Sequence, residues 1–95
     1  MSTWDESRIL ALAELSLEGS AMNEAALAGD LDESRFRAAL IAAKADECGL
    51  ATIATAARHV ERLLGIAGSE PNAGYGHAML QLANVISRDP GFVPL

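Results

Sequence analysis

Apolar residues recur every three or four positions over most of the chain, which is the spacing of helices that bury one face. The segment from about Leu50 to Leu64 has the cleanest pattern. Its apolar positions are Ile53, Ala56, Ala57, Val60, Leu63 and Leu64, and its polar positions are Thr55, Arg58, Glu61 and Arg62. We therefore expect a helix over this segment, with Ile53, Val60 and Leu63 buried.

The N-terminal segment also has helical spacing, with one interruption. Thr3 and Glu6 stand at the positions of a capping box, so we expect the first helix to begin there. Its expected apolar face is formed by Ile9, Leu10, Leu12, Ala13 and Leu17, and the pattern resumes at Met22, Ala25, Ala26 and Leu27. Gly19-Ser20 lies between the two parts, so the sequence leaves open one long helix or two short ones.

Helix-capping residues and glycines indicate where the remaining helices begin and end. Asp30 is a suitable N-cap, with Glu33 in capping-box position, for a helix that runs to about Cys48. Because only Gly49 separates this helix from the next, the two should form an antiparallel hairpin. Glycines crowd residues 65–76, which predicts a loop. A last helix should start at about Tyr75 and pack through Met79, Leu82, Val85 and Ile86.

The pattern as a whole predicts an all-α fold. We expect residues 1–95 to form a single domain, an antiparallel four-helix bundle with a central hairpin turning at Gly49 and a short C-terminal tail over 89–95. The tail, Phe92 to Leu95, is apolar.

The charge and the single cysteine limit which classes of binding partner and which cellular compartment we expect. Thirteen acidic and seven basic residues give a net charge of −6, which argues against binding to nucleic acid or to anionic membranes. The N-terminus has no signal-peptide pattern, and no apolar run approaches the roughly 20 residues that span a bilayer. The single cysteine, Cys48, suits a reducing compartment, so we expect a cytoplasmic protein in which Cys48 is a small core residue.

Residues capable of chemistry are few and scattered. His59 and His77 have no neighbours at metal-ligand spacing, so both are interpreted as surface histidines. No Ser or Thr has an indicated catalytic partner, and the glycines of 65–76 lack the Lys-Ser/Thr of a phosphate-binding loop. We therefore expect neither enzyme activity nor a cofactor nor a metal.

The helix from Leu31 to Cys48 has two apolar sides. Ala38, Ile41, Ala45 and Cys48, with Ser34, lie on one side, and Phe36, Ala39, Leu40 and Ala43 lie roughly opposite. A peripheral helix of a bundle buries only one side, so the second should be exposed and mark an interaction site. Its expected polar rim is Arg35, Asp46 and Glu47. The alternative is that the loop at 65–76 or the tail at 92–95 folds over it.

The stretch from Ala28 to Gly49-Leu50, followed by Ile53 and by Ala57 to Glu61, resembles the centre of a histidine-containing phosphotransfer (HPt) domain. In that family a capped helix carries the phospho-accepting His within a His-x-x-Lys-Gly motif and ends at a Gly about ten residues later. Here Ala39 stands at the position of the His, Ala42 at that of the Lys, and Ala43 at that of the Gly. Alanine has no nucleophilic nitrogen, so phosphoryl transfer at this position is chemically excluded.

The resemblance implies a degenerate HPt domain that keeps a docking surface for response-regulator receiver or kinase domains. The expected function is that of a non-catalytic adaptor or inhibitor. Its expected protein-binding residues are Arg35, Phe36, Ala39, Leu40, Ala42, Ala43, Asp46 and Glu47. Two other hypotheses remain open: a homodimeric helical module that buries the same side, and a small phage-type inhibitor or immunity protein that blocks an unrelated target.

Overall fold

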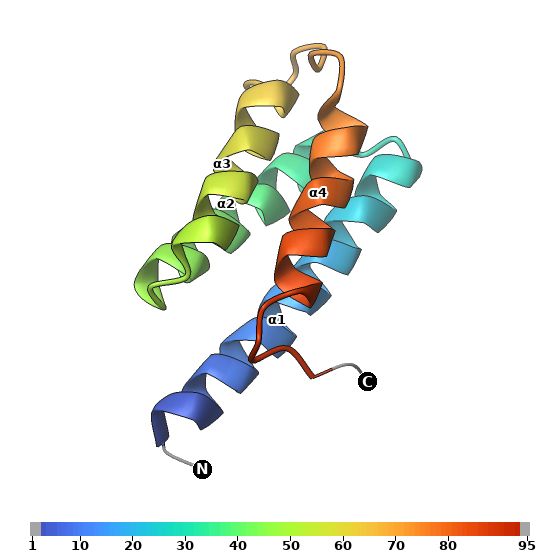
Figure 1. The fold of residues 1–95 in the computed structure, drawn as a ribbon. Helices are drawn as coiled ribbons and strands as arrows, with labels where there is room; N and C mark the ends of the chain where they lie inside the picture. Colours follow the sequence, from blue (N-terminus) through green and yellow to red (C-terminus); the bar gives the residue numbers. More distant parts are fainter. Residues whose placement is uncertain (1–2, 94–95) are drawn as a thin grey trace.

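The computed structural model describes residues 3–93, with side chains from residue 6 onward, and contains four α-helices (Figure 1). They are α1 (Thr3–Leu27), α2 (Leu31–Glu47), α3 (Ala51–Leu64) and α4 (Tyr75–Ser87). The described part of the chain holds no strand, so the all-helical prediction is confirmed. The capping role expected of the Thr3 side chain lies outside the described residues, as do Pro94 and Leu95 of the tail.

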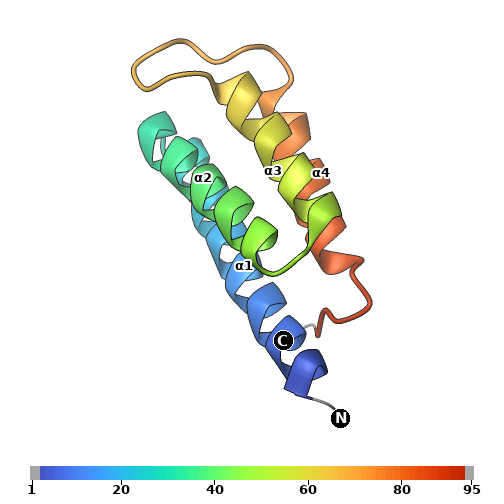
Figure 2. The same ribbon diagram turned by 90° about the vertical axis from the view of Figure 1, so that its left-hand side faces the viewer.

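Each helix packs against two others. α1 and α3 both contact α2, and both also contact α4, so the four helices surround one core (Figures 1 and 2). The resulting bundle measures 45 × 23 × 17 Å, and its long dimension follows α1. The loop between α3 and α4 lies at one end of the bundle, and the start of α1 lies at the other (Figure 2).

The ends of α2 follow their local sequence. The carboxylate of Asp30 accepts a hydrogen bond from the Glu33 amide at 3.1 Å, which confirms Asp30 as the N-cap. At the other end the chain turns at Gly49, whose φ of +70° lies in the left-handed region that favours glycine. The Leu50 amide donates to the Ala45 carbonyl at 2.8 Å, which satisfies one of the carbonyl groups at the end of the helix.

Among residues 6–93, twenty-one have little or no solvent exposure, and Ser34 is the single one of them with a polar side chain. Ser34 donates its hydroxyl hydrogen to the Met22 carbonyl at 2.8 Å and so joins α2 to α1. Ile53 and Val60 are buried as expected, whereas Leu63 is only partly buried. Cys48 is exposed, so its expected core position is wrong. The buried side of α2 ends at Ala45, and Cys48 is already the C-cap.

α1 is a single continuous helix, but its buried face differs from the expected one. Leu12 is buried as expected, but Leu15 is buried with it, whereas Leu10 is 64% exposed and Leu17 is 66% exposed. Ala13 is also exposed. Leucines occur on several sides of this segment, so spacing alone did not identify the side that the other helices would cover. Leu27 at the end of α1 is 90% exposed, so three leucines of this helix face solvent.

Gly19 lies inside α1 and is buried beside α4. A Cβ atom at this position would lie 3.9 Å from Ile86 Cδ1, an ordinary van der Waals contact. Replacing Gly19 with alanine should therefore raise the free energy of unfolding by roughly 0.5–1 kcal/mol, because alanine loses less backbone entropy in a helix. Urea denaturation measures the change. The matched variant Gly49→Ala should be destabilised, since its φ of +70° strains any L side chain. A loss of stability in Gly19→Ala would contradict this packing.

An ion pair connects α1 to the segment that follows α4. The Arg8 guanidinium donates to both carboxylate oxygens of Asp89, at 3.0 and 2.6 Å. The hydrogen bond from Arg8 and a further one from the Gly91 amide lower the pKa of Asp89. The Asp89 carboxylate therefore binds a proton less readily in the folded state than in the unfolded state.

The lowered pKa of Asp89 predicts how the stability of the protein changes in acid. The contribution of Asp89 to stability is present above the pKa of the unfolded carboxyl, roughly 3.9, and is lost as the pH falls through the folded pKa. Because solvent screens the pair, we expect a contribution of about 1 kcal/mol or less. Asp89→Asn should therefore lose less stability than the native chain between pH 5 and pH 3, as measured by urea denaturation at each pH. Identical pH dependence in both chains would show that the pair contributes nothing.

Candidate protein-binding site

One side of α2 presents apolar side chains to solvent. Phe36 is 55% exposed and Leu40 is 38% exposed, and the small residues Ala39 and Ala43 beside them are also exposed. Neither the loop between α3 and α4 nor the described part of the C-terminal tail buries Phe36. The sequence left open whether this side is covered, and within residues 3–93 it is exposed.

α1 adds a residue to this surface that sequence analysis assigned to the core. Leu17 lines a groove of about 330 Å³ together with Leu40 and Ala43 of α2. We define the binding face as Leu17, Phe36, Ala39, Leu40 and Ala43. At 100° per residue the helical projection places Leu17 roughly opposite to Leu12 and Leu15, but it does not tell which of the two sides is buried.

The groove between α1 and α2 has an acidic border. Glu14, Glu18, Lys44 and Glu47 line it. Lys44 pairs with Glu14, and Glu18 pairs with Arg37 at 3.0 Å. Both pairs join α1 to α2, and the hydrogen bond to Glu14 raises the pKa of Lys44. Glu47 keeps its expected place at the edge of the face.

Two of the other expected site residues lie elsewhere. Ala42 is buried in the core at 5% exposure, so its side chain does not reach the surface and it is removed from the site. Asp46 is exposed and pairs with Arg58 of α3, so it joins α2 to α3. On a helix that buries Ile41 and Ala45, the intervening Ala42 turns toward the same core.

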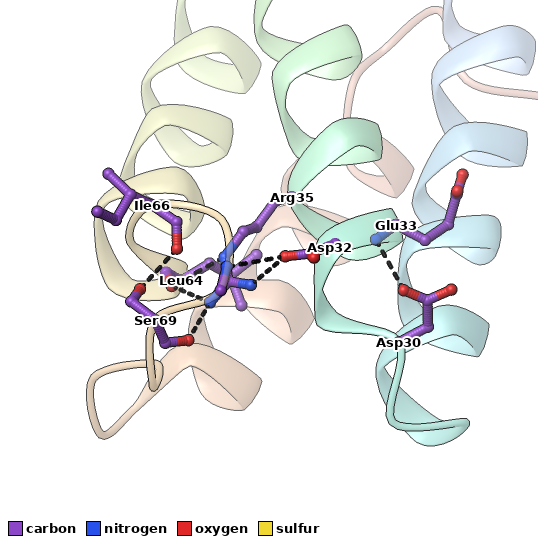
Figure 3. Close-up of polar contacts among 8 residues, drawn as sticks. Asp30, Asp32, Glu33, Arg35, Leu64, Ile66 and Ser69 are labelled. Atoms are coloured by element: carbon purple, nitrogen blue, oxygen red, sulfur yellow. Dashed lines mark hydrogen bonds and ion pairs between the residues drawn. The ribbon is translucent and has the colours of Figure 1, made fainter.

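Arg35 was expected in the polar rim, and the structure corrects this. Its guanidinium points to the end of α3 and donates to the Leu64 carbonyl at 2.8 Å and to the Ser69 carbonyl at 2.6 Å (Figure 3). Asp32 accepts from Arg35 Nη1 at 2.7 Å and from the Gly68 amide at 3.2 Å. The side chain of Arg35 is only 11% exposed. Arg35 therefore holds the start of the α3–α4 loop against α2 and caps the carbonyl end of α3.

Removing this guanidinium should destabilise the bundle. We expect Arg35→Ala to lower the free energy of unfolding by roughly 1–3 kcal/mol, because two partly buried carbonyls lose a charged donor. Arg35→Lys should recover only part of the loss, since an ammonium group cannot reproduce the planar fork. Urea denaturation measures both variants. Arg58→Ala is the matched control, because its pair with Asp46 is about half exposed, and it should change stability by less than about 1 kcal/mol. Equal effects of Arg35→Ala and Arg58→Ala would contradict the capping role.

The potential chemical groups of the chain do not converge on the binding face. His59 and His77 are both exposed, as expected, and His59 Nδ1 lies 3.5 Å from Arg62 Nη2. Among residues 3–93, no three His, Cys, Asp or Glu side chains are grouped as metal ligands would be. The binding face itself carries only hydrocarbon groups, which suit contact with another apolar surface.

No described helix has both the length and the apolar character needed to cross a membrane. Comparison of the chain with protein-family models, with curated proteins and with solved structures found no match.

Proposed function

We propose that this chain is a non-catalytic protein-binding module of the HPt type. In this proposal its four helices form an antiparallel bundle with the central hairpin turning at Gly49. The binding face docks a receiver or kinase domain of a two-component signalling system, as an adaptor or an inhibitor.

The observation that carries the proposal is the exposure of Phe36 and Leu40 on α2, with small Ala39 and Ala43 between and beside them. Contiguous apolar patches are uncommon on the surface of monomeric proteins and often mark the area that a partner covers. The small residues let a partner's backbone approach the helix closely. In the HPt resemblance, Ala39 stands at the position around which the family's docking surface is centred.

The proposal separates docking from phosphoryl transfer. Ala39 offers no atom that accepts a phosphoryl group, so a receiver bound at this face would be held without being phosphorylated or dephosphorylated by the chain. Incubation with active sensor kinases and labelled ATP should leave the protein unlabelled. Stable label on His59 or His77 would contradict the non-catalytic assignment.

Titration of the full chain against isolated receiver and kinase domains tests docking directly. We expect one-to-one complexes by isothermal titration calorimetry or sedimentation velocity with at least one receiver or kinase domain encoded near this chain's gene. Saturable binding that is lost in Leu40→Glu supports the proposal. The absence of binding across the panel would overturn the assignment to two-component signalling.

A second copy of the chain is an alternative occupant of the same face. Exposed leucines from both α1 and α2 favour this candidate, because they extend the apolar surface across two helices. Sedimentation equilibrium at micromolar concentrations distinguishes the two. If the chain is a monomer, the docking proposal stands. If it is a dimer that the Leu40→Glu substitution dissociates, the chain is a homodimeric module instead.

A further inference from the structure

The pair of helices that does not form the binding face carries a groove whose charged side chains are basic, whereas the groove between α1 and α2 has an acidic border. An open groove of about 840 Å³ runs between α3 and α4. Its lining includes four nitrogen-bearing side chains that are or can be cationic, His59, Arg62, His77 and Arg88, and it includes no carboxylate. All four of these side chains are exposed. A partner at this groove would therefore meet positive charge.

This groove contrasts with the charge of the rest of the molecule. Residues 1–47 contain ten acidic and four basic residues, so they account for the entire net charge of −6. Residues 48–95 contain three acidic and three basic residues. Two of the nearby carboxylates are engaged elsewhere, since Asp89 pairs with Arg8 and Asp46 pairs with Arg58. Two of the three arginines of the second half, Arg62 and Arg88, thus line one groove that has no carboxylate in its lining.

The groove is elongated. Along α3 its lining runs from Ala51 to Arg62, which at 1.5 Å per residue is about 16 Å. The beginning of α3 adjoins the end of α4, so Arg88 lies at one end of the groove, whereas Arg62 lies at the other (Figure 1). This length corresponds to roughly four or five residues of an extended peptide.

The neutral residues of the groove suit a peptide backbone. The amide side chains of Gln81 and Asn84 can each donate and accept hydrogen bonds, as can the hydroxyl of Thr55. Ala56 and Val85 supply apolar contact between them. A compact anion would use one end of this surface and leave the rest unused, whereas an extended segment contacts both ends and the middle.

We propose that the α3–α4 groove binds a short, extended acidic peptide segment of a partner protein, with carboxylates directed to Arg62 at one end and to Arg88 at the other. The site is separate from the binding face and independent of the proposed docking there. With both surfaces occupied, the chain would join an apolar surface of one protein to an acidic segment of another.

Fluorescence anisotropy with the full chain tests the proposal. The probe is a labelled octapeptide rich in Glu and Asp, and the control peptide has Gln and Asn at the same positions. We expect saturable binding of the acidic peptide alone, which weakens as salt is raised from 50 to 300 mM. The double variant Arg62→Ala, Arg88→Ala should bind about tenfold more weakly, because exposed ion pairs contribute up to about 1 kcal/mol each.

Arg58→Ala is the matched control for this experiment. It removes the same charge from α3 one turn away, but Arg58 pairs with Asp46 and does not line the groove. It should bind the acidic peptide within about twofold of the native chain, and so should Leu40→Glu on the binding face. Circular dichroism melting confirms that each variant is folded. An equal loss of binding in Arg58→Ala and in the double variant would overturn the site in favour of unspecific charge attraction, and so would equal binding of the two peptides.

Discussion

Replacing Leu40 with glutamate should remove partner binding while leaving the bundle folded. Leu40 lies at the centre of the binding face between Phe36 and Ala43, so a partner that covers it would desolvate the new carboxylate without pairing it. We expect a loss of about 2 kcal/mol or more in binding free energy, which is the effect typical of a central contact residue. Because the side chain is 38% exposed, the free energy of unfolding should change by only about 0.5 kcal/mol.

Two further variants make this test specific. Ala43→Asp places a charge on the same face by a second route and should give the same loss of binding. Leu80→Glu introduces the identical change at a leucine of α4 that is 62% exposed and lies outside the binding face, so it should bind normally. Titration and thermal melting are measured on all three. If melting collapses in Leu40→Glu while the folded fraction still binds, this side of α2 is core and the interface hypothesis fails.

Leu82→Ala should have the largest effect on stability. Leu82 is fully buried on α4 and belongs to the core cluster shared by all four helices. Truncation of a buried leucine costs about 2–5 kcal/mol through lost transfer energy and the cavity that remains. Domains of this size are stabilised by about 5–15 kcal/mol in total. The variant should therefore unfold at much lower urea concentration, and its melting temperature should fall by about 10 °C or more.

Leu80→Ala is the internal control for the core experiment. It makes the same substitution two residues away on the same helix, at a side chain that is 62% exposed. Its free energy of unfolding should change by less than about 0.5 kcal/mol. Comparable losses in both variants would mean that α4 is rotated relative to the packing described above.

The helices and their ends could be predicted where residues close together in the sequence determine them. Asp30 and Gly49 fix the ends of α2 through the caps that they form, and these interactions need no distant partner. The clean apolar pattern of α3 likewise identified Ile53 and Val60 as core. Counting the apolar sides of α2 indicated that Phe36 and Leu40 could be exposed, because a helix in a small bundle has only one side to bury, but it left open whether the loop or the tail covers them.

The rotation of α1 and the role of Arg35 could not be predicted in the same way. Leucines on several sides of α1 make its local pattern ambiguous, and the burial of Leu15 in place of Leu10 and Leu17 depends on how α2 and α4 pack against it. Arg35 looked like a rim residue because it is a charged residue beside the apolar side of α2 that contains Phe36. Its actual partners, the carbonyls of Leu64 and Ser69, lie about thirty residues away in the chain. Every residue has a backbone carbonyl, so the sequence does not indicate which carbonyls Arg35 binds.

The order in which the helices contact one another has a kinetic consequence. Three of the four interfaces join helices that are consecutive in the chain, and only the α1–α4 interface joins its two ends. Such local topology places the chain among rapid folders, with relaxation in microseconds to milliseconds. Most of the entropy lost in closing the chain is lost when the α1–α4 interface forms, because there Arg8 contacts Asp89, 81 positions away in the chain. That interface should be the last to form and the first to exchange its amide hydrogens.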